Sequence, residues 1–435
     1  MSLSRSRSLS IDALYRPIPQ EPETVPLDDD HAEEDTENSQ PRITPSTHNV
    51  VDTKIWWIFF ILGCSVLLPW NVVITAMPYF FERLAGSGIQ HTFGSYLSTA
   101  CTASNFIFLA HATITSKHTS PSSRTRQAIY CLVVLTFLLV VSTYFVLPAG
   151  LFFAFVLFNG AAQSAAGSYL QTAVIAVASL YGPAAVQAMM AGAGAHALLV
   201  SMSSYKAVAA TLEQNAAKSQ HNIDVMTSQP LMSRGSSEAD DDKRQTIRVA
   251  KVNIMYEVAV AYVFLITLAV FPPITTSIMP VNPETHPLLF TSIHFLVFNI
   301  GDLLGRYVCS FPIFHVWSRK RLLGLSLSRT LFIPLFLMCN VQRPSSFTTT
   351  TPIINSDFVF MFILLLFGLS NGYVSSSCMM SAPSLEHNPR LKGNVEDVDV
   401  AATVASFFLV GGLVMGSVAS FAVKGTICQC NPFRD

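Results

Sequence analysis

The sequence of 435 residues is poor in charge: Asp, Glu, Lys and Arg make up only 12% of it, whereas 51% of the residues are hydrophobic. Soluble domains carry roughly a quarter of charged residues. The 26 basic and 27 acidic side chains nearly cancel, so the basic excess typical of a nucleic-acid-binding domain is missing. The composition therefore argues against a soluble protein and a nucleic-acid partner, and it indicates a membrane protein.

Other common signals are missing too. Residues 1–54 are polar and contain no apolar core of a cleavable signal peptide. Most of the eight cysteines are scattered in apolar runs, and Cys428 and Cys430 are too isolated to form a zinc site. No G-x-x-x-x-G-K phosphate-binding loop occurs. We therefore expect no metal, no cofactor, no ATP-driven engine and no obligate protein partner.

What the sequence has instead is about ten apolar runs, each long enough to cross a ~30 Å hydrocarbon core as a helix. They lie at roughly 55–80, 93–115, 128–147, 151–179, 183–205, 252–274, 286–314, 322–341, 357–381 and 400–423. Lipid leaves the backbone few alternatives to the helix, so we predict an all-α polytopic membrane protein with a major-facilitator-like arrangement of two bundles.

The polar stretches divide the chain into four parts. Residues 1–54, with the run "DDDHAEED", are expected to be a disordered acidic tail. Residues 55–205 form the predicted N-terminal bundle, 206–251 a large polar loop, and 252–435 the predicted C-terminal bundle.

Basic residues in short loops predict the orientation, because cytoplasmic loops are enriched in Lys and Arg. Lys117, Arg124 and the "RKR" at 319–321 place two loops inside, and the connection 272–286 has no basic residue and is expected outside. With a cytoplasmic tail, five spans bring the chain outside, yet the span from 252 must start inside. One crossing is therefore missing between the fifth and the sixth predicted span.

The first run, "SVLLPWNVVITAMPYF" at 65–80, carries three unusual residues at its centre. Pro69 cannot donate a backbone hydrogen bond and is expected to kink the helix. Leu67, Trp70 and Ile74 share one helix face, and kinked helices at this depth often line substrate sites in transporters. A helix that simply packs its Trp in the core fits these residues equally well. Asn71 lies off that face and is interpreted as a contact to a neighbouring helix.

The run "FLVFNIGDLLGRY" contains the strongest signal. Phe295, Asn299, Asp302 and Arg306 are spaced by four, three and four residues, so they lie on one face of a helix. Ionisable residues inside a span are costly and almost always face the bundle interior or a wet cavity. Asp302 and Arg306, four residues apart, are also in the favourable order for an ion pair within one helix. The stripe therefore predicts a substrate-facing site, with a structural ion pair that joins helices as the alternative.

Polar residues and glycines interrupt other runs as well. "NGAAQSAAGSYLQ" places Gly167 and Gln171 one turn apart, and "AGAGAHA" contains Gly192 and Gly194, which permit close approach of helices. Asn371 lies in "GLSNGYVSSSCMM". Amides in a membrane more often bridge helices than bind solutes, but their recurrence in several spans favours one shared central pathway.

These pieces resemble the equilibrative nucleoside transporter family. The similar motifs are "LLPWN", the "LQ" and "GAG" of the fourth and fifth runs, "FNIGDLLGR" and "LSNGYVSSSCM", and they occur in the family's order between 55 and 423. The resemblance implies a six-plus-five helix arrangement with a nucleoside site between the bundles. It also implies a multi-pass protein of the plasma membrane or of a vacuolar or lysosomal membrane, with a cytoplasmic N-terminus.

The resemblance further implies roles for single residues. Trp70 would pack against the base or ribose near Leu67, Gln171 would bind the base, and Gly167 would leave room for bulky ligands. Asp302 and Arg306 would engage the ribose hydroxyls, supported by Asn299 and Phe295. Pro69, Asn71, Gly192, Gly194 and Asn371 are expected to be structural or gating residues. The implied activity is facilitated diffusion of nucleosides such as uridine and adenosine, not an enzymatic reaction.

Two departures from the family pattern stand out. Leu303 replaces the Trp that usually follows the Asp, and the family's sixth helix has no counterpart, which is the same missing crossing. The alternatives are a transporter of another small polar solute, such as a sugar or nucleobase, and a nucleoside-binding membrane protein that does not transport. An intramembrane aspartyl protease would need a second aspartate within a span.

Overall fold

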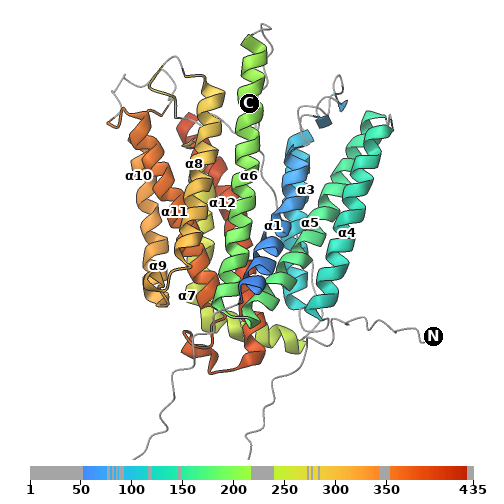
Figure 1. Ribbon diagram of the computed structural model, residues 1–435, viewed down its shortest axis with the longest axis vertical. Helices are drawn as coiled ribbons and strands as arrows, with labels where there is room; N and C mark the ends of the chain where they lie inside the picture. Colours follow the sequence, from blue (N-terminus) through green and yellow to red (C-terminus); the bar gives the residue numbers. More distant parts are fainter. Residues whose placement is uncertain are drawn as a thin grey trace, which may run out of the picture. The chain divides into compact units, whose positions relative to one another are not determined.

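The computed structural model describes residues 52–75, 79–80, 83–84, 87, 93–115, 120–145, 148–216, 240–271, 274–275, 278–282, 285–341 and 353–428. The predicted tail lies almost entirely outside the described residues. The first half of the chain contains α1 (Thr53–Thr75), α3 (Phe93–Ile114), α4 (Pro121–Val141), η2 (Ser142–Tyr144), α5 (Ala149–Leu180) and α6 (Pro183–Ala216) (Figure 1). The second half contains α7 (Asp240–Val270), α8 (Pro287–Val308), η4 (Pro312–Phe314), α9 (Arg319–Ser328), η5 (Arg329–Leu331), α10 (Phe332–Leu337), α11 (Asp357–Ser381), η6 (Pro389–Leu391), η7 (Val395–Asp397) and α12 (Val398–Cys428). We refer to α1–α6 as the N-terminal half and to α7–α12 as the C-terminal half.

The prediction of an all-α polytopic membrane protein is confirmed. Each predicted run is helical in the described part of the chain, with α9, η5 and α10 together occupying the run predicted at 322–341. Six of the helices, α4, α5, α6, α7, α11 and α12, are long and apolar enough to cross a membrane. Pro69 does not end α1, which continues to Thr75.

The outer face of α4 shows why the fold suits lipid. Tyr130, Val133, Phe137 and Val140 are three or four residues apart, and each is more than half exposed. An apolar stripe of this kind would be a liability in water. In a bilayer it is the surface that meets the acyl chains.

Glycines set the close packing of α8 against α11. A Cβ on Gly301 or Gly305 would collide with the backbone of α11, and one on Gly368 or Gly372 would collide with the backbone of α8. Both helices thus carry a small-xxx-small pattern at their interface. This close approach brings the backbone of Asp302 against Gly372 and places the two polar motifs of the C-terminal half side by side.

Glycine also sets the packing of α1 against α6. A Cβ on Gly192 would collide with the backbone at Phe60, and one on Gly63 would collide with the backbone at Met189. The Sγ atom of Cys64 lies 3.2 Å from the carbonyl oxygen of Gly192. The "AGAGAHA" motif therefore lies where α6 crosses α1.

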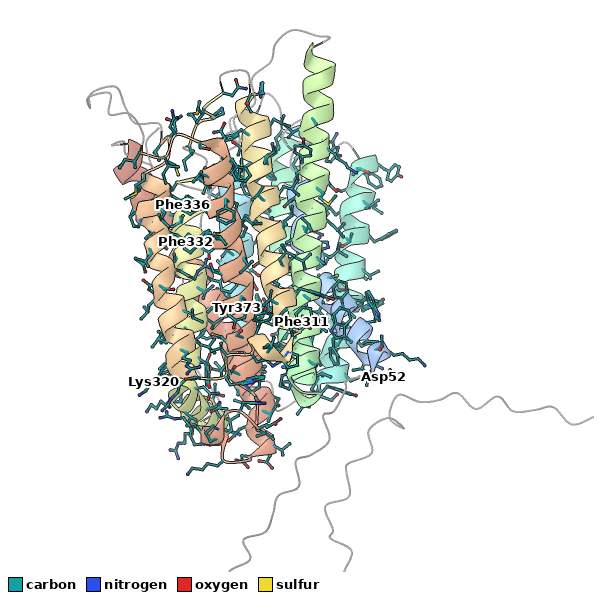
Figure 2. All side chains as sticks on the ribbon, turned by 60° about the vertical axis from the view of Figure 1, so that its left-hand side comes forward. Asp52, Phe311, Lys320, Phe332, Phe336 and Tyr373 are labelled. Atoms are coloured by element: carbon teal, nitrogen blue, oxygen red, sulfur yellow. The ribbon has the colours of Figure 1, made fainter. Side chains whose placement is uncertain are left out.

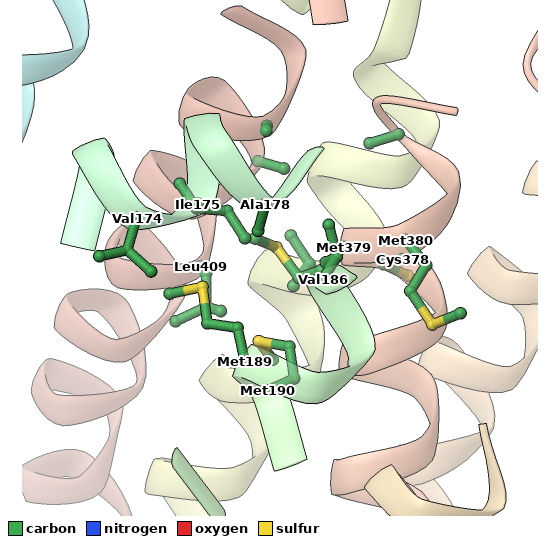
Figure 3. Close-up of a cluster of buried hydrophobic side chains, with 14 of the residues drawn as sticks. Val174, Ile175, Ala178, Val186, Met189, Met190, Cys378, Met379, Met380 and Leu409 are labelled. Atoms are coloured by element: carbon green, nitrogen blue, oxygen red, sulfur yellow. The ribbon is translucent and has the colours of Figure 1, made fainter. Parts of the chain in front are cut away.

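The largest apolar cluster joins the two halves, and we call it the inter-half cluster. Its members in Figure 3 are Val174, Ile175, Ala178, Val186, Met189, Met190, Cys378, Met379, Met380 and Leu409. They come from α5 and α6 on one side and from α11 and α12 on the other. The unbranched Met side chains can fill irregular gaps between the packed helices.

Side-chain contacts show how α6 runs relative to α8. The Nε2 atom of Gln187 donates to the carbonyl oxygen of Arg306, while Asn299 donates to Ser201. Later residues of α6 therefore meet earlier residues of α8, and the two helices are antiparallel.

The direction of α7 follows in the same way. Asn253 donates to the carbonyl oxygen of Ala382, and Thr267 lies 2.7 Å from Asn371, so α7 is antiparallel to α11. α8 and α11 are parallel, because Gly301 packs at Leu365 and Gly305 at Leu369. α6 and α7 are consequently parallel although they are consecutive described helices.

The range predicted as a large polar loop is partly helical. α6 continues to Ala216 and α7 begins at Asp240, so helices extend into both ends of the range 206–251. Ala, Leu, Lys and Glu in "KAVAATLEQNAAK" favour helix, which explains the extension of α6. The remaining connection, 217–239, lies outside the described residues, and its two ends belong to opposite ends of the helix bundle.

The ends of the bundle differ in charge. Figure 2 shows Asp52 and Lys320 near one end, and Phe332 and Phe336 toward the other. We call the first of these the basic end, because it gathers most described basic side chains: Lys54, Arg124, Arg126, Arg244, Arg248, Lys251, Arg319, Lys320, Arg321, Arg390 and Lys392.

Candidate functional site

The predicted ion pair forms and is almost completely buried. The Nε atom of Arg306 lies 2.7 Å from the Oδ2 atom of Asp302. The exposed fractions of these residues are 4% for Asp302 and 8% for Arg306. Their separation of four residues on α8 makes this contact a local consequence of helix geometry.

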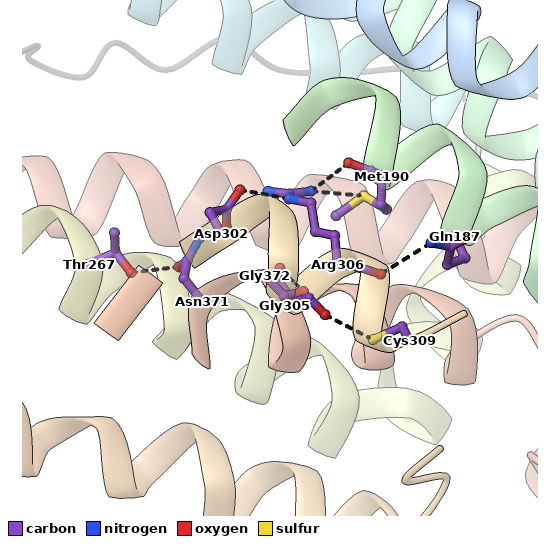
Figure 4. Close-up of polar contacts among 10 residues, drawn as sticks. Gln187, Met190, Thr267, Asp302, Gly305, Arg306, Cys309, Asn371 and Gly372 are labelled. Carbon is purple, nitrogen blue, oxygen red and sulfur yellow. Dashed lines mark hydrogen bonds and ion pairs between the residues drawn. The ribbon is translucent and has the colours of Figure 1, made fainter. Parts of the chain in front are cut away.

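A second set of hydrogen bonds orients the carboxylate from α11 (Figure 4). The Nδ2 atom of Asn371 donates to the Oδ1 atom of Asp302 over 2.7 Å. The Oδ1 atom of Asn371 in turn lies 2.7 Å from the hydroxyl of Thr267 on α7. Both carboxylate oxygens of Asp302 are therefore held by protein groups.

Arg329 extends this network to a fourth element, η5. Its Nη2 atom donates to the Thr267 hydroxyl over 2.8 Å, and its Nη1 atom donates to the carbonyl oxygen of Phe367 over 3.0 Å and to the hydroxyl of Ser370. The guanidinium also lies over the Phe367 ring, 4.5 Å from the centroid. We call Arg306, Asp302, Asn371, Thr267 and Arg329 the buried polar network.

The charges of this network do not balance. Asp302 is its one acidic member, whereas Arg306 and Arg329 both carry a guanidinium, which stays protonated in proteins. Buried charges are stable only when they are paired and hydrogen-bonded. Arg329 donates to Phe367, Ser370 and Thr267, which are neutral acceptors, and its Nε atom has no hydrogen-bond partner among the described residues.

Several predicted site residues bridge the two halves. Arg306 donates from Nη1 to the carbonyl oxygen of Met190 over 3.1 Å. Asn299 donates to the hydroxyl of Ser201 over 2.7 Å, and Gln171 donates to the hydroxyl of Ser406 over 2.8 Å. The polar stripes thus meet at the boundary between the halves, and the amides have the helix-bridging contacts that were the alternative interpretation.

The glycines of the predicted site differ in their surroundings. A Cβ on Gly167 would meet no atom within 4 Å, so α5 leaves open space at this turn. A Cβ on Gly194 would lie 2.8 Å from the Cδ atom of Arg306. Gly194 thus makes room for the side chain of Arg306, whereas the space beside Gly167 is not filled by described protein atoms.

The aromatic and apolar part of the predicted site is described only in part. Phe295 packs edge-on against Phe271, with ring centroids 4.9 Å apart. Leu67 lies partly buried on α1. The side chains of Pro69, Trp70 and Asn71 lie outside the described residues, so their predicted roles remain predictions.

The sequence analysis missed two buried charged residues. Arg329 and Glu257 each lie inside an apolar run, and both are almost inaccessible to solvent. A single charged residue in a membrane span is itself a functional signal. This signal was overlooked because neither Arg329 nor Glu257 belongs to a stripe with a recognisable spacing.

Taken together, the fold and the buried polar network define a polytopic helical membrane protein with a buried polar site in its C-terminal half, which Arg306 links to Met190 of α6. The sequence profile of the family described as "Nucleoside transporter" matches residues 206–425. The chain is similar to equilibrative nucleoside transporter 1 of Homo sapiens, with 22% identity over 86% of this chain and 97% of that protein. It is also similar to equilibrative nucleoside transporter 2 of Homo sapiens, with 28% identity over 85% of this chain and 96% of that protein.

A shorter match links the chain to equilibrative nucleoside transporter 3 of Rattus norvegicus, with 33% identity over 37% of this chain and 33% of that protein. The chain belongs to the equilibrative nucleoside transporter family. This is a family of transporters and not of enzymes, which removes the aspartyl protease alternative.

The alignment with the human transporter 1 is longer than the part of this chain that it covers. It extends over 453 positions, whereas the chain contributes 86% of its 435 residues to it. The alignment therefore includes positions at which the human protein has a residue and this chain has a gap.

Proposed function

We propose that this protein moves nucleosides across a membrane by alternating access, as facilitated diffusion down a gradient. The observation that carries the proposal is the buried polar network, because its Arg306 donates across the boundary between the halves to Met190 in a nucleoside transporter family member. Alternating access requires a site that two halves share and can expose to either side.

The chemistry of the site suits a nucleoside, which combines an aromatic base with a polyol. We assign the ribose hydroxyls to Asp302 and Arg306, with Asn299 and Phe295 beside them on α8. Gln171 would bind the base next to the open space at Gly167, and Trp70 would stack near Leu67. Uridine and adenosine are the substrates to test first.

The orientation follows from the basic end. Lysine and arginine gather on the cytoplasmic side of membrane proteins. We infer that α1 begins in the cytoplasm, which places the N-terminal residues there as well. The host membrane is a plasma membrane or a vacuolar or lysosomal one.

Uptake of labelled uridine and adenosine into cells that express the chain tests the proposal. Replacing Asp302 by Ala would leave Arg306 buried without its partner, so lost uptake alone would not distinguish binding from folding. If the indole binds the substrate, Trp70→Ala is expected to reduce uptake at unchanged surface expression. Unchanged uptake in Trp70→Ala would contradict the assigned role of the indole.

The bridge between Gln171 and Ser406 offers a sharper test, because each partner can be removed separately. Gln171→Ala and Ser406→Ala both remove the 2.8 Å hydrogen bond, but only the first removes the amide. If Gln171 binds the base, its variant raises KM about tenfold more than the Ser406 variant, the equivalent of one lost hydrogen bond of about 1.4 kcal/mol. Equal KM values would show that Gln171 only bridges helices.

One observation favours a second candidate, a nucleoside-binding membrane protein that does not transport. Because α6 and α7 are parallel, Ala216 and Asp240 lie at opposite ends of the bundle, and the sequence between them contains no apolar run long enough to span a membrane. Nucleoside binding to purified protein without uptake in cells would support this candidate. Measured uptake would reject it.

A further inference from the structure

Glu257 is a carboxyl group that the buried polar network does not use. It lies on α7, its side chain is completely buried, and neither of its carboxylate oxygens has a hydrogen-bond partner among the described residues. An isolated carboxylate in such a place is costly, and a buried carboxyl avoids this cost by taking up a proton. In membrane transporters, unpaired acids of this kind mark proton paths.

The neighbouring elements present few titratable or charged groups to Glu257. The thiol of Cys378 faces it from α11. Arg319 of α9 and Arg390 of η6 act on the adjacent Tyr256 hydroxyl, which donates to the carbonyl oxygen of Trp317. None of these groups forms an ion pair with Glu257 among the described residues.

The other elements that pack against α7 add little. Ala261 packs on Gly412, which places Glu257 near the stretch 404–409 of α12, where the sequence has no ionisable residue. On α3, His111 is exposed and hydrogen-bonded to Tyr169. Arg329 of η5 contacts Thr267, ten residues further along α7, which corresponds to about 15 Å of helix.

Glu257 lies on α7 next to residues of the inter-half cluster. Its neighbours Tyr256, Ala259 and Val260 belong to the inter-half cluster with Met189 and Met379. Glu257 lies at a level of the bundle near the basic end, because Cys378, which faces it, is close to the end of α11 at Ser381. The cluster closes this end, and separation of the halves at the cluster would bring water toward Glu257.

From this geometry we propose that Glu257 is a proton-binding site linked to opening of the basic end. It holds a proton on its carboxyl while the inter-half cluster is packed. When the halves separate there, the O–H bond breaks, the proton passes to water at that end, and the carboxylate is hydrated. The proposal rests on alternating access as proposed above.

The sign of the effect follows from linkage. Protonated Glu257 favours the packed state, so acid on the basic side holds that end closed and alkali favours opening. A single proton changes this equilibrium by at most about tenfold per pH unit. Nucleoside exchange should therefore slow as the pH at the basic end falls.

Exchange of labelled uridine in proteoliposomes containing the full chain tests the proposal, with the pH varied on each side separately. Glu257→Gln keeps the shape of the side chain but stays neutral. We expect wild-type exchange to rise several-fold, within the one-proton limit of about tenfold per pH unit, as the pH at the basic end rises. The Glu257→Gln variant should exchange slowly at every pH, like the wild type in acid.

Two control variants exclude other titrating groups at the same end. Glu386→Gln and His387→Gln change exposed or partly buried groups in the connection between α11 and α12, and both should retain the wild-type pH profile. A Glu257→Gln variant with the wild-type pH profile would overturn the proposal while leaving nucleoside transport intact.

Infrared difference spectroscopy provides a readout that does not depend on flux. A neutral carboxylic acid has a carbonyl stretch distinct from that of a carboxylate, and purified wild type at neutral pH should show this band where Glu257→Gln lacks it. If the wild type shows no uridine exchange, the proposed function fails, and the band still decides whether Glu257 holds a proton. An unchanged band in the variant would overturn the proton site.

Discussion

Thr267 connects Arg329 to the carboxamide that orients Asp302, although it is an uncharged residue with a single hydroxyl. Its Oγ1 atom accepts from Arg329 over 2.8 Å and lies 2.7 Å from Asn371. Removing a hydroxyl from a buried network leaves its partners unsatisfied. The network should therefore be sensitive to a change at Thr267 that hardly alters volume.

We expect Thr267→Val to lower the free energy of unfolding by about 1–3 kcal/mol, the cost of leaving a buried polar group unpaired. Thr143→Val is the matched control, because the Thr143 hydroxyl bonds only to the carbonyl oxygen of Val140 at an exposed site. Denaturation in detergent, followed by tryptophan fluorescence, measures both. Equal stability of the two variants would contradict the importance of the network.

His387 gives a pH-dependent contribution outside the membrane-spanning segments. Burial lowers the pKa of its imidazole below the ordinary value of 6.5; Glu386 raises the pKa and His315 lowers it further. The ring stacks on Trp317 with centroids 3.7 Å apart. The folded protein thus binds this proton less tightly than the unfolded chain does.

The sign follows directly: this group destabilises the fold as the pH drops below 6.5, and it has no such effect above that value. His387→Gln should therefore lose less thermal stability than the wild type between about pH 7.5 and about pH 5.5, the range in which an imidazole gains its proton. Unfolding temperatures in detergent at both pH values provide the measurement. A variant that loses as much stability as the wild type would show that other groups dominate.

Single-residue predictions succeeded where the contact is local. The spacing of Asp302 and Arg306 predicted the ion pair that forms. The bond from Asn371 to Asp302 could not be predicted, because it depends on how closely α11 approaches α8. Arg329 carried no local pattern, and only the tertiary structure shows which groups satisfy its guanidinium.

At the scale of elements, the α8–α11 interface determines whether the polar motifs can meet. Gly372 lies against the backbone of Asp302, and a methyl group there would push the helices apart. Backbone atoms cannot turn away as a flexible side chain can. The interface therefore tolerates no side chain at this position without a shift of a whole helix.

We expect Gly372→Ala to destabilise the protein by about 1–3 kcal/mol through overpacking, and to lower nucleoside uptake. Gly411→Ala is the control on α12, since a Cβ there meets no atom within 4 Å and alanine favours helix. Thermal unfolding and uptake are measured on both. A Gly372 variant as stable and active as the Gly411 variant would contradict this packing.

Helix positions could be predicted well from the sequence, and helix ends less well. Runs of apolar residues located all the described α-helices, because lipid imposes length and composition together. α6 extends to Ala216, beyond the predicted end at 205, because its residues there are polar but still favour helix. Hydropathy marks the part of a helix in lipid, not where the helix stops.

At the scale of the whole molecule, one crossing is missing between α6 and α7, because these consecutive described helices are parallel. Positive residues in loops had already predicted it, and the contacts of α6 with α8 and of α7 with α11 agree with it. The alignment with equilibrative nucleoside transporter 1 of Homo sapiens also includes positions at which this chain has a gap. Our hypothesis is that the chain is a shortened form, by gene-model error or splicing, of an eleven-helix transporter.

Sequencing of the transcript across residues 195–250 tests this hypothesis. We expect a longer message that encodes one more apolar run of about 20 residues, the length of one spanning helix. A continuous message without such a run would reject the gene-model version.

Glycosylation scanning gives an independent test on the protein, because the sequence contains no N-x-S/T sequon that would interfere. In the present chain, sequons introduced just after Ala216 and just before Asp240 should lie on opposite sides, so only the first becomes glycosylated. Sequons placed in the connections near 117 and near 281 serve as the inside and outside references. Modification at both or neither of the test positions would show that α6 and α7 do not span as the bundle requires.

The sequence by itself determined the membrane class, the places of the helices, the family and the Asp302–Arg306 pair. Each of these depends on composition, on short sequence motifs or on contacts within one helix turn. Only the tertiary structure decided which groups hold Asp302, that Gln171 and Asn299 bridge the halves, and that Glu257 is buried with no hydrogen-bond partner among the described residues. Those properties depend on the approach of helices far apart in the chain, and the glycines that permit this approach acquire their meaning only when the opposite backbone is in place.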